Sequence, residues 1–210
     1  MNTVQRVAAF CNSVEYIESN NIAGAIVICG IWRGGIAMAA IDTLQKLNIS
    51  NREIYLYDTF KGMITPATDY DVKTGGNTGV GKNAEELYKN ASKDDYIFCY
   101  SAITEVKENI NQYNYPEDKV HYIQGLVNDT IPEFMPKKIA LLYFSISFYT
   151  PVLHTLTHLY PLLQSGGVLF VSDYGDWEGT KKAVDEFTAA NPIKLLLNRI
   201  DSSGRIGIKL

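Results

Sequence analysis

The segment at residues 23–40, AGAIVICGIWRGGIAMAA, limits the possible folds more than any other part of the chain. An apolar run over residues 26–29 stops at Gly30, and a second apolar pattern rich in small residues begins after Gly35. This order predicts a buried strand, a glycine turn and the start of a helix. Such a turn brings helix N-terminal N–H groups close to a ligand in nucleotide-binding α/β proteins, although ordinary strand-to-helix turns also contain glycine.

The remaining chain alternates between strand and helix patterns. Further strands are expected in EIYLYDTF, KVHYIQG, IALLYFSISFY and GGVLFVSDYG, and a closing pair in KLLLNRI and RIGIKL around the turn at residues 201–204. Helices are expected at about residues 3–19, 36–47, 84–91, 102–113, 150–163 and 178–190. This alternation predicts an α/β fold of three layers, αβα, with a mostly parallel sheet and one antiparallel strand.

The composition of the chain indicates which class of molecule it binds. With 210 residues, a net charge of -4 and scattered basic residues, the chain has the size of one domain and no basic patch for nucleic acid or an anionic membrane. Its apolar runs are too short to span a membrane, and the N-terminus has no secretory signal pattern. Three cysteines without C-x-x-C spacing argue against a disulfide framework or a zinc site. We therefore expect a cytoplasmic protein that binds a small molecule, either a monomer or a homo-oligomer.

Two further features support the prediction that the chain binds a ligand. Residues 61–82 are rich in Gly, Thr, Asp and Asn and lack a sustained period, which predicts a lid loop within a single domain at residues 1–210, with plain disorder as the alternative. Asp58 falls at the carboxyl end of a predicted strand, where it can accept hydrogen bonds from both ribose hydroxyls of a nucleotide-like cofactor. The alternative for Asp58 is a helix cap or a turn.

Several segments together match a known family. They are GIWRGGIAMA, LYDTFKGM followed by Thr65-Pro66, YPEDKVHYIQGLVNDTIP, IALLYFSISFY, LYPLLQSGG and SDYGDWEGTKKAVDEF, in the family's order from about residue 24 to 190. The sequence resembles the macrocin-type O-methyltransferases, which use S-adenosylmethionine to methylate sugar hydroxyls of macrolides and related glycosides. The resemblance implies a Rossmann-like methyltransferase fold with S-adenosylmethionine as cofactor.

The resemblance also implies where the cofactor binds. Its methionine part is expected beside the turn at Gly30 and residues 32–35, its ribose on Asp58, and its adenine near Gly125 and Leu126. The full predicted set of cofactor-binding residues is Gly30, Trp32, Arg33, Gly34, Asp58, Thr59, Gly125, Leu126 and Ser145.

The chain lacks several acidic residues that are typical of this family. Ile28 stands where the family has an acidic residue, Ser145 and Ser147 replace an Asp-x-Asp pair, and Ser172-Asp173 replaces Asp-Asp. In the enzymes it resembles, these aspartates hold magnesium, and one is thought to act as the base. One carboxylate among serine hydroxyls is a poor magnesium site, so we expect weak or no magnesium binding and assign no metal ligands.

Two residues are candidate bases for removing the hydroxyl proton. Asp173 lies at a strand's carboxyl end, with a structural turn as the alternative, and His154 shares a helix face with His158, where both can instead be surface or core residues. Tyr149, Tyr174 and Trp177 either line a substrate pocket or belong to the core. We therefore expect an O-methyltransferase that acts on a hydroxyl of a glycoside or other small metabolite with weak or no metal dependence. The alternative is a cofactor-binding pseudoenzyme or an enzyme of different chemistry on the same fold.

Overall fold

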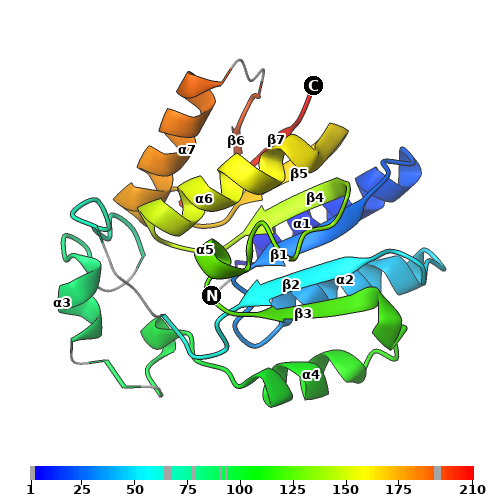
Figure 1. Ribbon diagram of the computed structural model, residues 1–210, viewed down its shortest axis with the longest axis horizontal. Helices are drawn as coiled ribbons and strands as arrows, with labels where there is room; N and C mark the ends of the chain where they lie inside the picture. Colours follow the sequence, from blue (N-terminus) through cyan, green and yellow to red (C-terminus); the bar gives the residue numbers. More distant parts are fainter. Residues whose placement is uncertain (1–2, 64–67, 77–78, 90, 93, 192–194) are drawn as a thin grey trace.

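Seven strands form the sheet in the part of the chain that this computed structural model describes, residues 3–63, 68–76, 79–89, 91–92, 94–191 and 195–210. They are β1 (Ala25–Cys29), β2 (Ile54–Asp58), β3 (Val120–Gln124), β4 (Ile139–Phe144), β5 (Leu163–Val171), β6 (Asn198–Arg199) and β7 (Arg205–Ile208). Their order is β3-β2-β1-β4-β5-β7-β6 (Figure 1). Strands β1 to β5 pair in parallel, and β7 is antiparallel to both neighbours. The predicted mostly parallel sheet with one antiparallel strand is confirmed.

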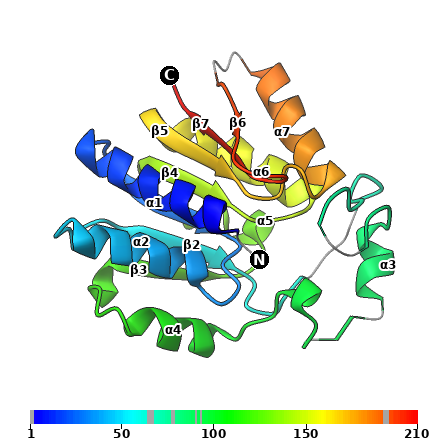
Figure 2. The same ribbon diagram turned by 180° about the vertical axis from the view of Figure 1, so that it is seen from behind.

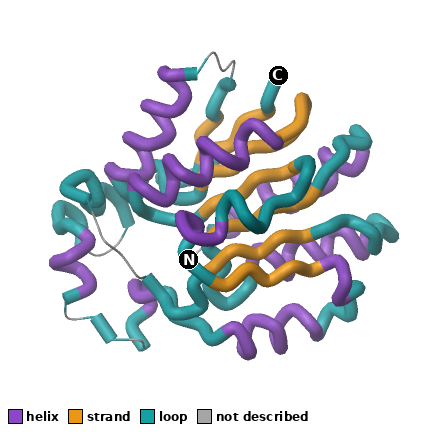
Figure 3. The backbone as a smooth tube through the Cα atoms, viewed as in Figure 1, coloured by secondary structure: helices purple, strands orange, loops and turns teal. Residues whose placement is uncertain are grey.

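Helices cover both faces of this sheet. They are α1 (Val4–Ser19), α2 (Gly35–Lys46), α3 (Ala84–Tyr88), α4 (Ile103–Asn111), α5 (Val127–Thr130), α6 (Tyr149–Leu159) and α7 (Glu178–Ala190), with short 3₁₀ turns η1 (Tyr96–Phe98), η2 (Glu117–Lys119) and η3 (Tyr160–Leu162). One apolar core lies between the sheet and α1, α2 and α4, and a second between the sheet and α5, α6 and α7. Figures 2 and 3 show the resulting three layers.

Strands β1 and β4 have every residue buried because helices cover both of their faces. Their continuous apolar sequences, AIVIC and IALLYF, fit this position in the middle of the sheet. The arrowheads of the central strands point toward the side on which α3 lies (Figure 1). The carboxyl ends of β1, β2, β4 and β5 therefore meet at one edge, which is the edge where open α/β sheets bind ligands.

The described residues of the predicted lid lie beside that edge (Figure 1). Residues 64–67, which include Thr65 and Pro66, and residues 77–78 fall outside the described residues. In the described part, Val72 bridges Asn83 and Lys73 bridges Trp177. The Lys73 ammonium lies 5.0 Å from the centre of the Trp177 ring. These contacts dock the segment on the loop before α7; its function as a lid stays a prediction.

Helix α1 begins as predicted, but its buried face differs from the simple apolar pattern. The pattern Val4, Val7, Ala8, Cys11, Val14 and Ile17 predicts the buried stripe, whereas Val4 is 83% exposed. The residues that are buried are Arg6, Phe10, Ser13, Val14 and Ile17. Phe10 packs edge-on against Tyr143 and Phe170, and Arg6 pairs with Asp201. An ion pair formed on folding thus turns a basic residue inward.

The Arg6–Asp201 pair is nearly excluded from solvent, with side chains 6% and 10% exposed. Asp201 accepts hydrogen bonds from Arg6 Nε at 3.0 Å, from Thr3 at 2.6 Å and from the backbone N–H of Gly204 at 2.6 Å. Burial alone would raise the pKa of Asp201, but the hydrogen bonds from Thr3, Gly204 and Ser203 and the charge of Arg6 lower it from 3.8 to about 2. The charged form is therefore the form that stabilises the fold.

This pair predicts a loss of stability in acid. A pKa lowered from 3.8 to about 2 contributes about 2 kcal/mol that is fully present above pH 4 and lost as the pH falls toward 2. Urea unfolding of wild type and Asp201→Asn at pH 7, 4 and 2.5 should show the difference between them shrinking in that window. Asp118→Asn, at an exposed side chain, is the control and should change stability by no more than about 0.5 kcal/mol. A difference that stays constant with pH contradicts the prediction.

Two predicted boundaries are wrong. The helix expected to be capped by Thr150 begins instead at Tyr149, whose N–H donates to the Asp71 carboxylate at 2.7 Å, and ends at Leu159 before a 3₁₀ turn. The closing strands are shorter than KLLLNRI and RIGIKL predict, and β6 has only two residues. Among the described residues, no helix combines the length and apolar character needed to cross a membrane.

Candidate functional site

The glycine turn after β1 requires glycine at its first position. Gly30 has φ +81°, and a Cβ there would lie 2.3 Å from the carbonyl oxygen of Ser145, which follows β4. Trp32 and Gly34 also have positive φ, at 50° and 87°, and Gly34 is the N-cap of α2. The turn therefore packs its backbone directly on the residues after β4.

Asp58 holds this turn from the end of β2. Its Oδ2 accepts hydrogen bonds from the N–H groups of Ile31 at 2.7 Å and Trp32 at 3.1 Å, and its Oδ1 accepts one from Phe60 at 2.8 Å. In this structure the Asp58 carboxylate therefore supports the glycine turn, and its predicted role toward a ribose remains a prediction. Gly125 adds a backbone hydrogen bond to the Asp58 carbonyl at 3.0 Å.

The other predicted cofactor residues lie along the same edge. Thr59 follows Asp58 and donates its hydroxyl to the Gly62 carbonyl at 2.9 Å, and Leu126 is the N-cap of α5. Arg33 is exposed, lies 3.6 Å from Glu105 and stacks over Trp32. The fold brings these residues to the carboxyl edge of the sheet, as the resemblance implies; their contacts with a cofactor stay predictions.

Asp173 forms the centre of a small polar cluster at the ends of β4 and β5. The hydroxyls of Ser145 and Ser147 both donate to its Oδ2, each at 3.2 Å. No described residue hydrogen-bonds to its other oxygen, Oδ1. Asp173 is half-buried, and Ser145 links it to the Gly30 turn.

The surroundings of Asp173 make its carboxyl a stronger base. Burial raises the pKa of Asp173, and the charge of Asp176 acts in the same direction, while the charge of Arg6 and the hydrogen bond from Ser147 oppose the shift. A carboxylate with a raised pKa holds a proton more readily near neutral pH, which is the property that a general base requires.

His154 does not lie in this cluster. Its Nε2 is 3.0 Å from the carbonyl oxygen of Ile131, and its ring lies 4.2 Å from that of His158, centre to centre. His158 Nδ1 in turn lies 2.9 Å from the His154 carbonyl oxygen. The structure thus places the histidine pair on the α5 side of α6 and does not bring it to Asp173.

The three aromatic residues predicted to line a substrate pocket or to belong to the core lie in different places. Trp177 is buried, with its ring centre 5.2 Å from that of Phe148. Tyr149 donates its hydroxyl to Glu186 at 2.6 Å, and Tyr174 donates to Asp185 at 2.6 Å. Trp177 therefore belongs to a small core near the site, and both tyrosines pack against the core beneath α6 and α7 while their hydroxyls bind carboxylates of α7.

Four side chains that the sequence patterns did not single out also belong to the site's surroundings. Arg6 reaches Ser172 from α1, and the carboxylate of Asp71 caps α6 next to Ser147. Burial raises the pKa values of Cys99 and Tyr88, and the negative charge of nearby Asp173 acts in the same direction on both. The local sequence pattern does not single out Arg6.

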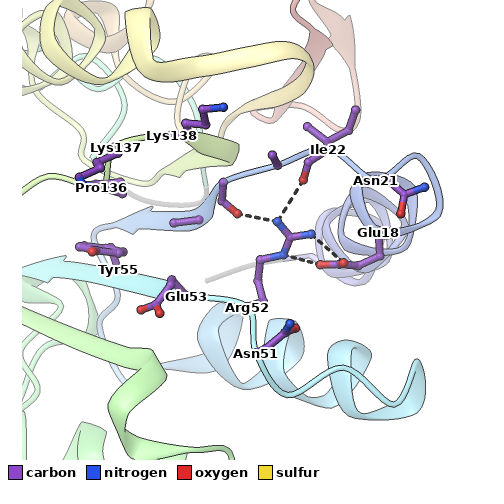
Figure 4. Close-up of a pocket in the computed structure, with 13 residues that line it drawn as sticks. Glu18, Asn21, Ile22, Asn51, Arg52, Glu53, Tyr55, Pro136, Lys137 and Lys138 are labelled. Carbon is purple, nitrogen blue, oxygen red and sulfur yellow. Dashed lines mark hydrogen bonds and ion pairs between the residues drawn. The ribbon is translucent and has the colours of Figure 1, made fainter.

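A separate hollow of about 560 Å³ opens at the amino ends of the strands, at the opposite edge of the sheet. Figure 4 shows Arg52 in it, joined to Glu18 by hydrogen bonds at 2.6 and 2.7 Å. Arg52 also donates to the carbonyl of Ile22 at 3.0 Å. This arginine is held by partners within the fold, and the residues predicted for the site do not line the hollow.

The strand order, the antiparallel β7, the glycine turn after β1 and the acid after β2 together define a Rossmann-like methyltransferase fold. The family is shown by comparison with known proteins. The model of the macrocin O-methyltransferase (TylF) family matches residues 1–206, and the chain belongs to this family. The predicted family and its class, the S-adenosylmethionine-dependent methyltransferases, are confirmed.

Individual relatives agree with this assignment. The chain is 30% identical over 201 residues to demethyldecarbamoylnovobiocin O-methyltransferase of Streptomyces niveus, covering 96% of this chain and 72% of the relative. It is 24% identical to mycinamicin III 3''-O-methyltransferase of Micromonospora griseorubida, covering 96% and 74%. The solved structure of the O-methyltransferase NovP superposes with a TM-score of 0.81 at 27% identity, covering 98% of this chain and 80% of that one.

Proposed function

We propose that this protein transfers the methyl group of S-adenosylmethionine to a hydroxyl of a glycoside or a similar small metabolite, with Asp173 as the base. The observation that carries the proposal is the Asp173 carboxylate: two serine hydroxyls hold its Oδ2, and no described residue occupies Oδ1. Family membership supports the reaction class, and the names of the relatives support a glycosidic acceptor.

The bound cofactor supplies a methyl group made reactive by a positively charged sulfur. In the proposed reaction, a bond forms between the acceptor oxygen and the methyl carbon while the bond from that carbon to sulfur breaks. Asp173 accepts the hydroxyl proton and later releases it to water. The residues proposed to hold the cofactor are the nine predicted above, including the turn at Gly30 and Asp58. They orient the two reactants, which accounts for much of the rate in a displacement of this kind.

The donor set around Asp173 does not fit magnesium, and the proposed reaction uses none. Magnesium prefers six oxygen ligands with carboxylate help, whereas this cluster offers one carboxylate with the hydroxyls of Ser145 and Ser147. Ser172 already accepts a hydrogen bond from Arg6 at 2.9 Å, so a positive charge is present beside the cluster.

Two measurements test the proposal. S-adenosylmethionine and its demethylated product should each raise the unfolding temperature, because a ligand at 100 times its Kd stabilises a fold by about 2.7 kcal/mol. Transfer of a labelled methyl group is then measured with demethyldecarbamoylnovobiocin and simpler glycosides, with EDTA or added magnesium. We expect product formation that EDTA does not reduce.

The outcomes separate the alternatives. Absence of any shift with both cofactor forms overturns the proposal. A shift without transfer to any acceptor identifies a cofactor-binding protein without methyl transfer. Transfer that disappears with EDTA and returns with magnesium overturns the metal-independent part alone.

A further inference from the structure

The carboxylate of Asp71 lies where three segments of the chain meet. Asp71 is 0% exposed, and its Oδ1 accepts a hydrogen bond at 2.7 Å from the N–H of Tyr149, the first residue of α6. Its Oδ2 accepts two from Thr68, one from the N–H at 2.6 Å and one from the hydroxyl at 2.9 Å. A Cβ added at Gly179, near the start of α7, would lie 2.0 Å from Oδ1. The lack of a side chain at Gly179 therefore leaves the room that this carboxylate occupies.

The backbone that follows Asp71 is joined to the loop that carries Asp173. The N–H of Glu178 donates to the carbonyl of Val72 at 2.9 Å. The N–H of Trp177 donates to the carbonyl of Asp173 at 3.2 Å. The segment that contains Asp71 is therefore fixed against the loop after β5.

The side chain of Asp71 is joined to the loop that carries Ser147. Ser147 lies two residues before Tyr149, and its hydroxyl donates to Asp173 Oδ2 at 3.2 Å. Its carbonyl accepts a hydrogen bond from the hydroxyl of Thr180 at 2.9 Å. The loop after β4 is thus held by Asp71 and by Thr180. Because Asp71 is joined to both loops, it fixes the separation across which Ser147 reaches Asp173.

We propose that Asp71 is a positioning residue for Asp173: by joining the start of α6 to the loop after β5, it keeps the Ser147 hydroxyl on Asp173 Oδ2 and leaves Oδ1 for the acceptor hydroxyl. A carboxylate suits this role because both of its oxygens accept, one from Tyr149 and the other from Thr68. Asparagine has nearly the same size but only one accepting oxygen, so it can satisfy only one of these two sides. The effect on methyl transfer rests on the proposed function, whereas the placement of Ser147 against Asp173 does not.

Aspartate labelled with ¹³C at Cγ tests this placement without turnover, because the carbon follows the protonation of its own carboxyl. The Asp173 resonance is identified by its loss in Asp173→Asn. The hydrogen bond from Ser147 lowers the pKa of Asp173, so this resonance should titrate at a higher pH in Ser147→Ala than in wild type. Asp71→Asn should move it in the same direction, although removal of a nearby negative charge by itself lowers a carboxyl pKa. In the Ser147→Ala background, Asp71→Asn should no longer raise it. The other groups that act on Asp173 are unchanged in these variants: Arg6, Asp176, Cys99 and Tyr88.

Gly179→Ala tests the same contact without changing the charge of Asp71, and it replaces Asp71→Asn if that variant does not fold. The added Cβ displaces the carboxylate from the N–H of Tyr149, while alanine within α7 favours the helix. The Asp173 resonance should again titrate at a higher pH. Asp69→Asn is the control, because Asp69 is exposed, lies two residues before Asp71 and loses the same charge; its titration should match wild type. A midpoint that stays the same or falls in either folded variant overturns the proposal.

Turnover tests the consequence for catalysis. Asp71→Asn should lower kcat about tenfold, which corresponds to about 1.4 kcal/mol, because Asp173 loses a bond that keeps Oδ1 in one orientation. The KM for S-adenosylmethionine should not change, since the side-chain hydrogen bonds of Asp71 go to none of the residues proposed to bind the cofactor. Asp69→Asn should keep the wild-type kcat. A wild-type kcat in Asp71→Asn, or a loss confined to KM, overturns the positioning role. Absence of turnover in the wild type overturns the proposed function, while the Asp173 titration still decides whether Asp71 positions Ser147.

Discussion

Replacing Asp173 by asparagine is expected to lower the methyl-transfer rate by about 10² to 10⁴-fold, the usual contribution of a general base. The amide is nearly the same size, and its oxygen can still accept the hydrogen bonds that Ser145 and Ser147 donate. It cannot take up the acceptor's proton. Turnover should therefore fall while the thermal shift with S-adenosylmethionine stays at the wild-type value.

Asp176→Asn is the matched control for this variant. Asp176 lies in the same loop and its charge acts on Asp173, but it makes none of the hydrogen bonds to the Asp173 carboxylate. We expect its turnover to stay within about threefold of wild type, since a neighbouring half-buried charge contributes well under 1 kcal/mol. If Asp173→Asn retains the full rate and His154→Gln loses it, the base is His154, and the proposed role of Asp173 is wrong.

Gly30→Ala has the largest expected effect on stability. Positive φ in a residue with a side chain costs about 1–3 kcal/mol, and forcing an extra carbon into a packed position costs about 1–3 kcal/mol more. At Gly30 both apply, because φ is +81° and the new Cβ would lie 2.3 Å from the Ser145 carbonyl oxygen. Thermal unfolding should show a loss of about 2–6 kcal/mol, and the shift with S-adenosylmethionine should disappear.

Gly35→Ala provides the control within the same turn. An added Cβ at Gly35 meets no atom within 4 Å, and the residue is the first of α2. Alanine at such a position is expected to leave stability unchanged or raise it by about 0.5–1 kcal/mol. If the two alanine variants have the same unfolding temperature, the turn is not constrained by its approach to Ser145.

The local patterns of the chain were enough for the fold class. Runs such as AIVIC and IALLYF, with helix patterns between them, predicted the parallel sheet, and Glu178–Ala190 forms the helix expected there. The position of Asp173 at the carboxyl edge of the sheet was also predictable, because it follows a buried strand, and its role as a base stays a proposal. A strand that is buried on both faces requires apolar residues, so each segment's own sequence indicates that it forms a buried strand.

The pattern of a single segment did not predict a residue's position correctly where its ion-pair or hydrogen-bond partner lies far away in the sequence. The apolar pattern of α1 does not include Arg6, but Arg6 is buried against Asp201, 195 positions away. Thr150 was the expected cap of α6, whereas the cap is Asp71, 78 positions before Tyr149. Neither partner can be identified from the local spacing of apolar and polar residues.

The sequence by itself therefore determined the order of strands and helices along the chain, the glycine turn after β1 and the place of Asp173 at the carboxyl edge of the sheet. Each of these depends on residues that are close to one another in the sequence. Only the tertiary structure decided that Asp58 holds the Gly30 turn, that His154 faces Ile131, and that Arg6 reaches Ser172 across 166 positions. Hydrogen bonds and ion pairs between remote segments form only when packing removes water from both partners, and the amino-acid order of one segment does not specify them.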